Sequence, residues 1–438
     1  MGWMSKLDEW VKILGTYGVN MQKVVVLLVS TCLSLSAATA YKYIGQDIGP
    51  SAQRVSDQPG ATVPCKTARS ASATDFSFTT FGGGGAPSYN EIAIEKNVFY
   101  FQRTLKEVGQ NPDQAKIWFA NGNDGRKTVR YIDNGQEKFK SPTIPGVQGS
   151  ATFANLRSAM QDESSQAKPL FFYFTGHGSH NTTDEQNNAM ILWNEQNANV
   201  QQFTTMLDKM PPEKPFVAVM VQCYSGAFAN LIYSGGRPKQ GVALHDRCGF
   251  FATVKERPSV GCTPEVNEAD YRDYSSSFFA GLSGISRTGQ RVDSADYDGD
   301  RRISFREAHA FAKIDEKASD LPVSTLEVWL QENLSNRDRA IALSRPIRES
   351  LKTARPEQRQ VVRRLAQRIE YDLGQSIRLN LSHTQQGRKP RSSIDRTYAE
   401  RIELELINIA AEKKVRESGN PEAMAILEKL LTCEGRSI

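Results

Sequence analysis

Two short apolar runs, each followed closely by a residue that can act in catalysis, constrain the fold of this chain more than any other feature. Residues 170–174 precede His177, and residues 216–221 precede Cys223. Runs of this length are typical of strands buried on both faces of a parallel sheet. Such strands end at a common edge, where open α/β sheets bind ligands, so we expect His177 and Cys223 to lie together there.

The two side chains form a pair with a specific chemistry. A thiolate attacks a carbonyl carbon, while a nearby imidazole takes the thiol proton and later protonates the leaving amine. Gly178 allows a close backbone approach and can point its N–H at a developing oxyanion. Ser225 and Gly226 permit a tight turn into a helix over residues 227–232, whose dipole would lower the pKa of Cys223. A lone buried cysteine is usually a core residue, but the order and spacing of the pair favour catalysis.

Strand and helix patterns alternate along the chain from residue 78 onward. Helical spacing recurs over residues 97–108, 153–160 and 200–210. This alternation predicts an α/β fold with a mostly parallel sheet and helices on both faces, a three-layer αβα sandwich. From about residue 321 only helical spacing remains. We therefore predict a catalytic domain over 78–320 and a helical C-terminal region over 321–438. We favour a packing role for that region, with regulation or docking as the alternative.

Three further segments carry a family resemblance together with the two motifs. Residues 81–90, 117–122 and 248–253 are similar to strand segments of the caspase-like cysteine peptidases of clan CD, most closely the legumain-like branch. The likeness covers about residues 78 to 315, and the 46 residues from His177 to Cys223 are close to caspase spacing. The resemblance implies a caspase-like sandwich, with His177 as general acid/base and Cys223 as nucleophile. It also implies an oxyanion hole formed by the N–H groups of Gly178 and Cys223.

The residues expected to bind the substrate side chain depart from the legumain pattern. Val221 and Gln222 stand before the cysteine, where that pattern has Glu-Ala. The family's substrate-binding arginine aligns with Asn90, and Glu91 follows it. If Glu91 lines the pocket for the residue before the scissile bond, it would favour Arg or Lys. Asparagine, aspartate and basic preferences all stay open.

Residues 296–307 have the spacing of an EF-hand-type calcium loop. Calcium takes about six to eight oxygen ligands, and the loop offers them at the usual positions. Arg301 stands where such loops have glycine, which strains the turn. We predict a structural Ca²⁺ and no organic cofactor, with a metal-free acidic turn as the alternative. The expected ligands are the carboxylates of Asp296, Asp298 and Asp300, the carbonyl of Arg302, Ser304 or a water beside it, and Glu307.

The N-terminal segment over 1–40 contains the three parts of a secretory signal. Lys23 precedes the apolar stretch 24–35, and small residues stand at 38–40, with Met21 as an alternative start. We predict cleavage and export to a secreted or periplasmic location. A retained N-terminal anchor or lipidation at Cys32 are the alternatives, and only these would give a membrane contact. Residues 41–77, rich in Ser, Ala, Asp and Pro, predict a linker or surface arm.

Four cysteines remain for disulfides if the signal is removed and the nucleophile stays a free thiol. Cys248 and Cys262 bracket a short polar loop and form the first predicted pair. The second predicted pair is Cys65 with Cys433, which would tie the ends of the mature chain together.

The formal net charge of +5 lies in the C-terminal region, where residues from Leu321 onward carry 21 Lys and Arg against 16 Asp and Glu. The basic residues are interspersed with acidic ones, which is typical of a solvated helical surface and gives no basis for nucleic-acid binding. The sequence thus predicts an exported cysteine endopeptidase acting on peptide or protein substrates. A peptide ligase with the same dyad and a catalytically silent, calcium-stabilised binding module are the alternatives. The oligomeric state stays open.

Overall fold

The structure is a computed structural model that describes residues 75–385 and 392–438, without the side chains of 383–385. These residues belong to one compact unit, Arg69–Ile438. The predicted signal or anchor segment over 1–40, the predicted linker up to residue 74, and with them Cys32 and Cys65, lie outside the described residues. Within the described part, no helix has the length and apolar character that crossing a membrane requires.

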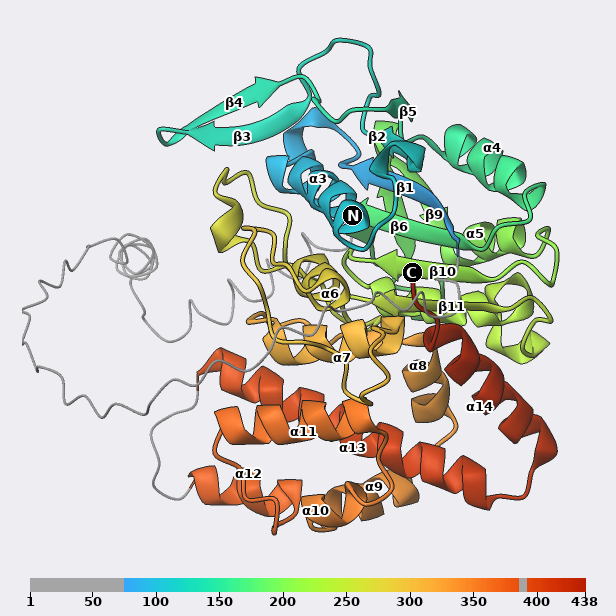
Figure 1. The fold of residues 1–438 in the computed structure, drawn as a ribbon, viewed down its shortest axis with the longest axis vertical. Coiled ribbons are helices and arrows are strands. Elements are labelled where there is room, and N and C mark those ends of the chain that lie inside the picture. The colour runs from blue at the N-terminus through green and yellow to red at the C-terminus, as the bar shows by residue number, and fades with distance from the viewer. Residues whose placement is uncertain (1–74, 386–391) are drawn as a thin grey trace, which may run out of the picture. The chain divides into compact units, whose positions relative to one another are not determined.

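A seven-stranded sheet forms the centre of this unit (Figure 1). Its order is β12-β11-β10-β6-β1-β2-β5, and all neighbouring strands run parallel except β11 and β12. The predicted mostly parallel sheet is therefore confirmed, and β6 and β10, the strands before His177 and Cys223, are neighbours. The strands are β1 (Ser77–Gly83), β2 (Lys116–Phe119), β5 (Val147–Gly149), β6 (Leu170–Gly176), β10 (Phe216–Met220), β11 (Arg247–Phe251) and β12 (Val323–Ser324).

Side chains of β6 enter two separate hydrophobic cores in alternation. Leu170, Phe172 and Phe174 lie in the first core, while Phe171 and Tyr173 lie in the second. The residues of β10 alternate in the same way. Successive side chains of a strand point to opposite faces, so an uninterrupted apolar strand requires cover on both. The apolar runs of the sequence reflect this double burial.

Helices cover both faces of the sheet and make the predicted three-layer arrangement (Figure 1). The second core is closed by α3, α6 and α7, and the first by α4, α5, α8 and α14 together with the 3₁₀ helix η5. The long α3 begins five residues earlier than its predicted start. The bounds are α3 (Ile92–Glu107), α4 (Phe153–Ser164), α5 (Val200–Leu207), η5 (Ser225–Ile232), α6 (Tyr274–Ser283), α7 (Phe305–Asp315), α8 (Thr325–Glu332) and α14 (Pro421–Glu434).

The C-terminal region is helical, as predicted, and builds a third core against α7. Ala310 and Ile314 of α7 join apolar residues from four of the C-terminal helices in this core. The region also returns to the sheet, because β12 pairs with β11 and α14 packs in the first core. The remaining helices are α9 (Asn336–Ser344), α10 (Ile347–Ser350), α11 (Pro356–Arg368), α12 (Ile377–Gln385) and α13 (Ser393–Glu417).

Two small antiparallel sheets flank the carboxyl edge of the main sheet and were not predicted. One is the β3–β4 hairpin, and the other, β7-β8-β9, begins directly after His177. Four of their strands are short or polar and so lack the apolar runs that predict strands, whereas the apolar run of β8 was overlooked. They are β3 (Val129–Asp133), β4 (Gln136–Lys140), β7 (Gly178–Ser179), β8 (Ala189–Leu192) and β9 (Gln196–Asn199).

Cys248 and Cys433 form a disulfide, with their Cα atoms 6.0 Å apart. The predicted pairings of Cys248 with Cys262 and of Cys433 with Cys65 are therefore wrong. Cys248 lies near the amino end of β11, where α14 packs, whereas Cys262 follows the carboxyl end of that strand. An extended strand separates the two residues although they are close in sequence.

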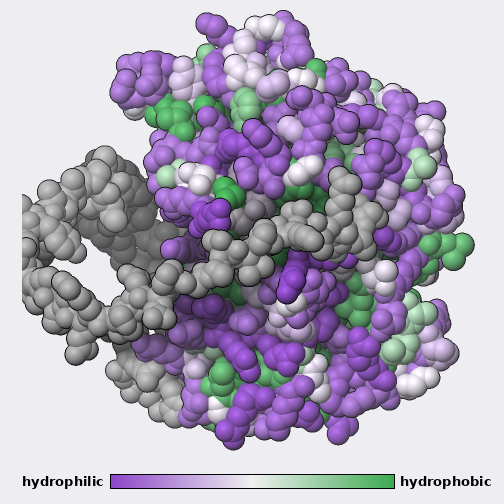
Figure 2. Space-filling view, viewed as in Figure 1, coloured by the Kyte–Doolittle hydropathy of each residue, from purple (hydrophilic) through white to green (hydrophobic). Residues whose placement is uncertain are grey.

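The surface seen in Figure 2 is mostly hydrophilic. In the described part of the chain, the exposed large apolar side chains belong to different segments. They are Phe139, Leu244, Val266, Ile341 and Leu379. Single exposed apolar residues of this kind are ordinary in proteins and indicate no particular partner.

Candidate active site

The register of the sheet places His177 and Cys223 at equivalent positions of neighbouring strands. Phe174 of β6 pairs with Met220 of β10, and each candidate residue lies three positions beyond its paired residue. The N–H of Val221 donates to the carbonyl of Phe174 at 3.2 Å, so the two chains remain side by side past the end of the ladder. The expected common edge is therefore present, and both residues lie at it.

Gly178 brings the backbone after His177 directly against Cys223. A Cβ atom at Gly178 would lie 2.0 Å from the carbonyl oxygen of Cys223 and 2.9 Å from the side chain of Gln222. Real side chains cannot approach so closely, so only glycine fits. The N–H of Gly178 faces the Cys223 sulfur, the position from which it could also contact an oxyanion.

The nucleophile candidate lies on a tight turn that ends β10. The next residue, Tyr224, has the left-handed conformation with φ of 60°, and η5 then begins as a 3₁₀ helix. The thiol is partly buried, and its sulfur accepts the N–H of Ser259 at 3.4 Å. Burial raises the pKa of Cys223, although the N–H groups of Ser259 and Gly178 oppose this. The predicted lowering of the Cys223 pKa is thus wrong, because burial, which disfavours the thiolate, is the largest influence on it.

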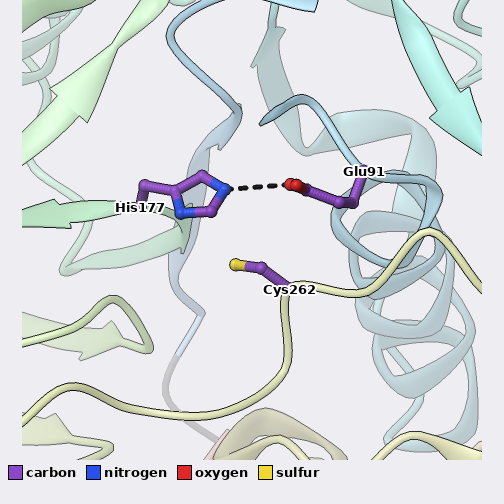
Figure 3. A group of neighbouring side chains, drawn as sticks. All are labelled: Glu91, His177 and Cys262. Atoms are coloured by element: carbon purple, nitrogen blue, oxygen red, sulfur yellow. Dashed lines mark hydrogen bonds and ion pairs between the residues drawn. The ribbon is translucent and has the colours of Figure 1, made fainter. Parts of the chain in front are cut away.

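His177 is paired with a carboxylate that the sequence assigned to a different task. Its Nε2 lies 2.9 Å from Oε2 of Glu91, the residue immediately before α3 (Figure 3). Arg130 of β3 donates to the other oxygen, Oε1, at 2.7 Å. Burial alone would raise the pKa of Glu91, but the contacts with His177 and Arg130 leave it below its usual range. A buried, ionised carboxylate of this kind orients an imidazole and stabilises its protonated form.

Neither of the two residues predicted to bind the substrate side chain is available for that role. Glu91 is only 5% exposed and has both oxygens engaged. Asn90 is fully buried, and its amide accepts the N–H of Gly84 at 2.9 Å and donates to the carbonyl of Thr128 at 3.2 Å. Asn90 therefore fastens the loop after β1, and Glu91 serves the histidine. Sequence similarity aligned these positions but carried no information on which way the side chains point.

The loop that contacts the sulfur is held from the helical region. The N–H of Val260, next to Ser259, donates to Asp320 at 3.1 Å. Arg401 of α13 is buried and donates to the backbone carbonyl of Asp320 at 2.8 Å and to the carboxylate of Glu316 at 3.2 Å. Burial raises the pKa of Asp320 to about 7. The helical region thus reaches the surroundings of Cys223 through two consecutive contacts.

A second free thiol lies beside the histidine. Cys262, predicted to be in a disulfide, is a free and exposed cysteine. Its sulfur, a nitrogen of His177 and an oxygen of Glu91 all lie within 4.8 Å of one another. Figure 3 shows the sulfur pointing toward the imidazole from the loop that follows β11. The only signal in the sequence was that a cysteine stands in a polar loop beyond a core strand.

The predicted calcium loop connects to α7 and brings three of its carboxylates together. Oxygen atoms of Asp296, Asp298 and Glu307 lie within 4.8 Å of one another. Arg301 adopts the left-handed conformation with φ of 68°, as a glycine would at this position of such loops. These hard oxygen donors fit Ca²⁺, which binds carboxylates in flexible geometry.

The other predicted ligands make contacts within the loop or with the chain end. Asp300 accepts the N–H of Arg302 at 2.7 Å, and the Arg302 side chain donates to Ser437 at 2.7 Å. The hydroxyl of Ser304 donates to Glu307 at 2.8 Å as part of the capping box of α7. The loop therefore joins the start of α7 to the C-terminal end of the chain.

A scan against models of protein families gives no match to this chain, and a search of curated proteins gives none. Among solved structures, the chain is similar to the protein GSU0716 from Geobacter sulfurreducens, with 12% sequence identity and a TM-score of 0.31. The likeness covers 54% of this chain and 88% of that chain. A score this low supports no inference about function, so the chemistry of the site rests on its own residues.

Proposed function

We propose that this protein is a cysteine endopeptidase, with Cys223 as nucleophile, His177 as general acid/base and Glu91 as the partner that positions the histidine. The observation that supports this most is the Glu91–His177 pair at the end of β6, with the adjoining Gly178 packed against Cys223 at the end of β10. A carboxylate, an imidazole and a thiol at the carboxyl ends of neighbouring strands are the three groups that nucleophilic acyl transfer by a cysteine uses. The sequence resemblance to caspase-like peptidases leads to the same proposal.

The reaction begins from a protonated thiol, because burial raises the pKa of Cys223. Nε2 of His177 faces Glu91, so Nδ1 is the nitrogen left to take the thiol proton as the sulfur attacks the peptide carbonyl. The N–H groups of Gly178 and Cys223 stabilise the oxyanion. The imidazolium then protonates the leaving amine, and an acyl-enzyme remains. Water, deprotonated by His177, hydrolyses the thioester and restores the thiol.

Glu91 stabilises the imidazolium during both proton transfers. Its carboxylate stays ionised near neutral pH because Arg130 and His177 hold its pKa low. An ionised carboxylate beside a histidine favours the charged ring and fixes which nitrogen faces the substrate. Because Glu91 is occupied in this way, the residues that select the substrate side chain are not assigned.

We further propose that Asp296, Asp298 and Glu307 hold a structural Ca²⁺ and that the protein is exported. The ion would fasten the loop before α7 and so brace the second core, in which Phe305 packs. Extracellular calcium, at about millimolar concentration, saturates even weak sites of this class. Export is supported by the signal pattern in residues 1–40.

An active-site probe tests the proposed nucleophile. We expect an acyloxymethyl ketone or epoxide probe to label the wild-type chain once, with peptide mapping placing the label on Cys223. Cys223→Ala should lose both the label and the cleavage of a peptide library. Cys262→Ala is the matched control, because it removes the neighbouring free thiol and should leave Cys223 labelled.

Labelling only at Cys262, or library cleavage that survives in Cys223→Ala, would contradict the proposal. No labelling and no cleavage by the folded wild-type chain would favour the silent binding module. Adding a peptide amine and analysing the products separates hydrolysis from ligation, since a ligase transfers the acyl group to the amine in preference to water.

A further inference from the structure

Three donor atoms of different chemistry meet beside the proposed dyad. The sulfur of Cys262, an imidazole nitrogen of His177 and a carboxylate oxygen of Glu91 lie within 4.8 Å of one another (Figure 3). They come from three separate segments, the loop after β11, the end of β6 and the residue before α3. The fold therefore assembles this cluster from parts that are distant in sequence.

The donor set has the chemistry of a zinc site. Zn²⁺ binds thiolate sulfur at about 2.3 Å and imidazole nitrogen or carboxylate oxygen at about 2.0 to 2.2 Å, in tetrahedral geometry. Donors around such an ion are about 3.3 to 3.8 Å apart, so the Nε2–Oε2 pair, at 2.9 Å, needs to open slightly and the sulfur, within 4.8 Å of both, to approach by at most about 1 Å. The thiolate favours zinc over calcium and magnesium, which prefer oxygen ligands.

The surroundings of the cluster orient its donors, of which the Glu91 side chain is 5% exposed and the His177 side chain 23%. Arg130 occupies Oε1 of Glu91, so the other oxygen, Oε2, is the one that faces His177. The thiol of Cys262 lies 3.8 Å from the carbonyl of Gly176; the residue as a whole is exposed, but burial of the thiol and the nearby charge of Glu91 raise the pKa of Cys262 well above its usual range. Tyr89 packs edge-on against the His177 ring, with the ring centroids 5.4 Å apart. Such neighbouring contacts commonly fix the orientation of metal ligands.

We propose that Cys262, His177 and Glu91 form a regulatory site for Zn²⁺, with a fourth position open to water. Binding replaces the Sγ–H bond of Cys262 with an Sγ–Zn bond, and the released proton goes to solvent. Zinc replaces the contact between Nε2 of His177 and Glu91 with an Nε2–Zn bond, and the ring proton moves to Nδ1, which then cannot accept the proton of Cys223. The inhibitory part of this proposal rests on the proposed function, whereas the binding part does not.

Direct metal binding tests the site without relying on catalysis. The protein used is the full chain with Cys223→Ala, saturated with calcium, in a phosphine reductant that does not compete as a thiol would. Zn²⁺ is titrated against a chromophoric chelator, and Co²⁺ is used as a spectroscopic substitute. We expect one tight zinc ion per chain and a thiolate-to-cobalt charge-transfer band.

Removing the sulfur should abolish both signals. Adding Cys262→Ser should weaken zinc binding by more than about tenfold, since even indirect contacts of metal ligands cost about 10- to 100-fold in affinity. The charge-transfer band should disappear, and thermal unfolding should stay unchanged because serine keeps the shape of the side chain. The matched control is His180→Gln, which removes another loop histidine paired with a carboxylate, Glu185 at 3.3 Å, and should leave zinc binding intact.

Equal zinc affinity with and without Cys262, or a cobalt complex that lacks the charge-transfer band, would overturn the site. In the chain with intact Cys223, Zn²⁺ should slow probe labelling, and a chelator should restore it. Failure of labelling in metal-free protein would count against the proposed peptidase alone, because zinc binding is measured separately in the Cys223→Ala chain.

Discussion

The central sheet has an amino edge, where its parallel strands begin, and a carboxyl edge, where they end. Each of these carries a buried carboxylate, and the two carboxylates have different partners. At the amino edge, Glu163 of α4 accepts from Ser77 at 2.9 Å and from Lys116 at 2.7 Å, and it lies 3.3 Å from Lys214. At the carboxyl edge, Glu91 pairs with His177 and Arg130. Burial would raise the pKa of both carboxyls, but their cationic partners leave both lowered.

The difference lies in what the partners can do. Ser77, Lys116 and Lys214 stand at or just before the starts of β1, β2 and β10, so Glu163 fastens three strands together. His177 is 23% exposed, carries an imidazole and has the free thiol of Cys262 close by. A buried carboxylate alone therefore does not mark an active site, and our proposal depends on the pairing of Glu91 with a partly exposed imidazole.

The largest expected effect is on catalysis at the carboxyl edge. Glu91→Gln keeps the shape of the side chain but removes the charge that stabilises the imidazolium. We expect kcat/KM for a cleaved peptide to fall about 10⁴-fold, as for neutralised triad carboxylates, with little change in unfolding temperature. Steady-state kinetics and thermal unfolding measure both. If the variant instead unfolds more easily and keeps its turnover, Glu91 is a structural residue like Glu163.

The amino edge should show the opposite pattern. Glu163→Gln leaves Lys214, which is 1% exposed, without its counter-charge. We expect unfolding to become easier by about 3 to 5 kcal/mol, the usual result of breaking a buried ion pair. Urea denaturation measures this loss, and the folded fraction should keep its kcat/KM. If Glu163→Gln instead lost catalysis and kept its stability, Glu163 and Glu91 would no longer differ in role.

The two kinds of cysteine sharpen the comparison further. The double variant Cys248→Ala/Cys433→Ala removes a disulfide that closes a long loop, with 185 positions between its ends. We expect a loss of about 2 to 4 kcal/mol in the free energy of unfolding, measured by urea titration. Cys262→Ala is the control and should unfold like the wild type. Equal stability of the double variant and this control would mean that the disulfide carries no stabilising constraint.

A third buried carboxyl, Glu434, shows what happens without a cationic partner. It accepts from the hydroxyl of Thr325 at 2.7 Å and the N–H of Leu326 at 2.8 Å, and burial raises its pKa to about 7. A raised carboxyl pKa stabilises the fold fully at low pH, and this stabilisation is lost as pH rises through about 7.

Glu434→Gln removes this titration while keeping an acceptor oxygen. From pH 5 to pH 8 the variant should lose about 2 kcal/mol less stability than the wild type, in urea titrations at both pH values. Asp320, whose pKa is also about 7, contributes the same trend to both proteins and serves as an internal reference. Parallel stability curves for the two proteins would contradict a raised pKa for Glu434.

The sequence predicted the parts of the fold that depend on local pattern. Apolar runs predicted β6 and β10 because both faces of these strands are buried, and helical spacing predicted α4, α5 and the C-terminal helices. The hairpin β3–β4 was missed because charged and polar residues interrupt its apolar ones, so no apolar run marks either strand. The start of α3 was placed too late, and that error concealed the position of Glu91.

The sequence predicted the positions of the candidate residues that directly follow core strands. It did not predict the positions of those that depend on the path of a loop. His177, Gly178 and Cys223 follow core strands, so their shared edge follows from strand order. The position of Cys262 depends on how the loop after β11 returns toward β6, and no local pattern records that path. The pairing of Glu91 with His177 likewise joins segments that are 86 residues apart.

The disulfide between β11 and α14 has a consequence for limited proteolysis of this chain. A single backbone cut anywhere between Cys248 and Cys433 yields two polypeptides that remain covalently joined. Such a nicked, two-chain form would keep its mass until reduction and would then separate into fragments. Clipping in this interval therefore need not release the helical region.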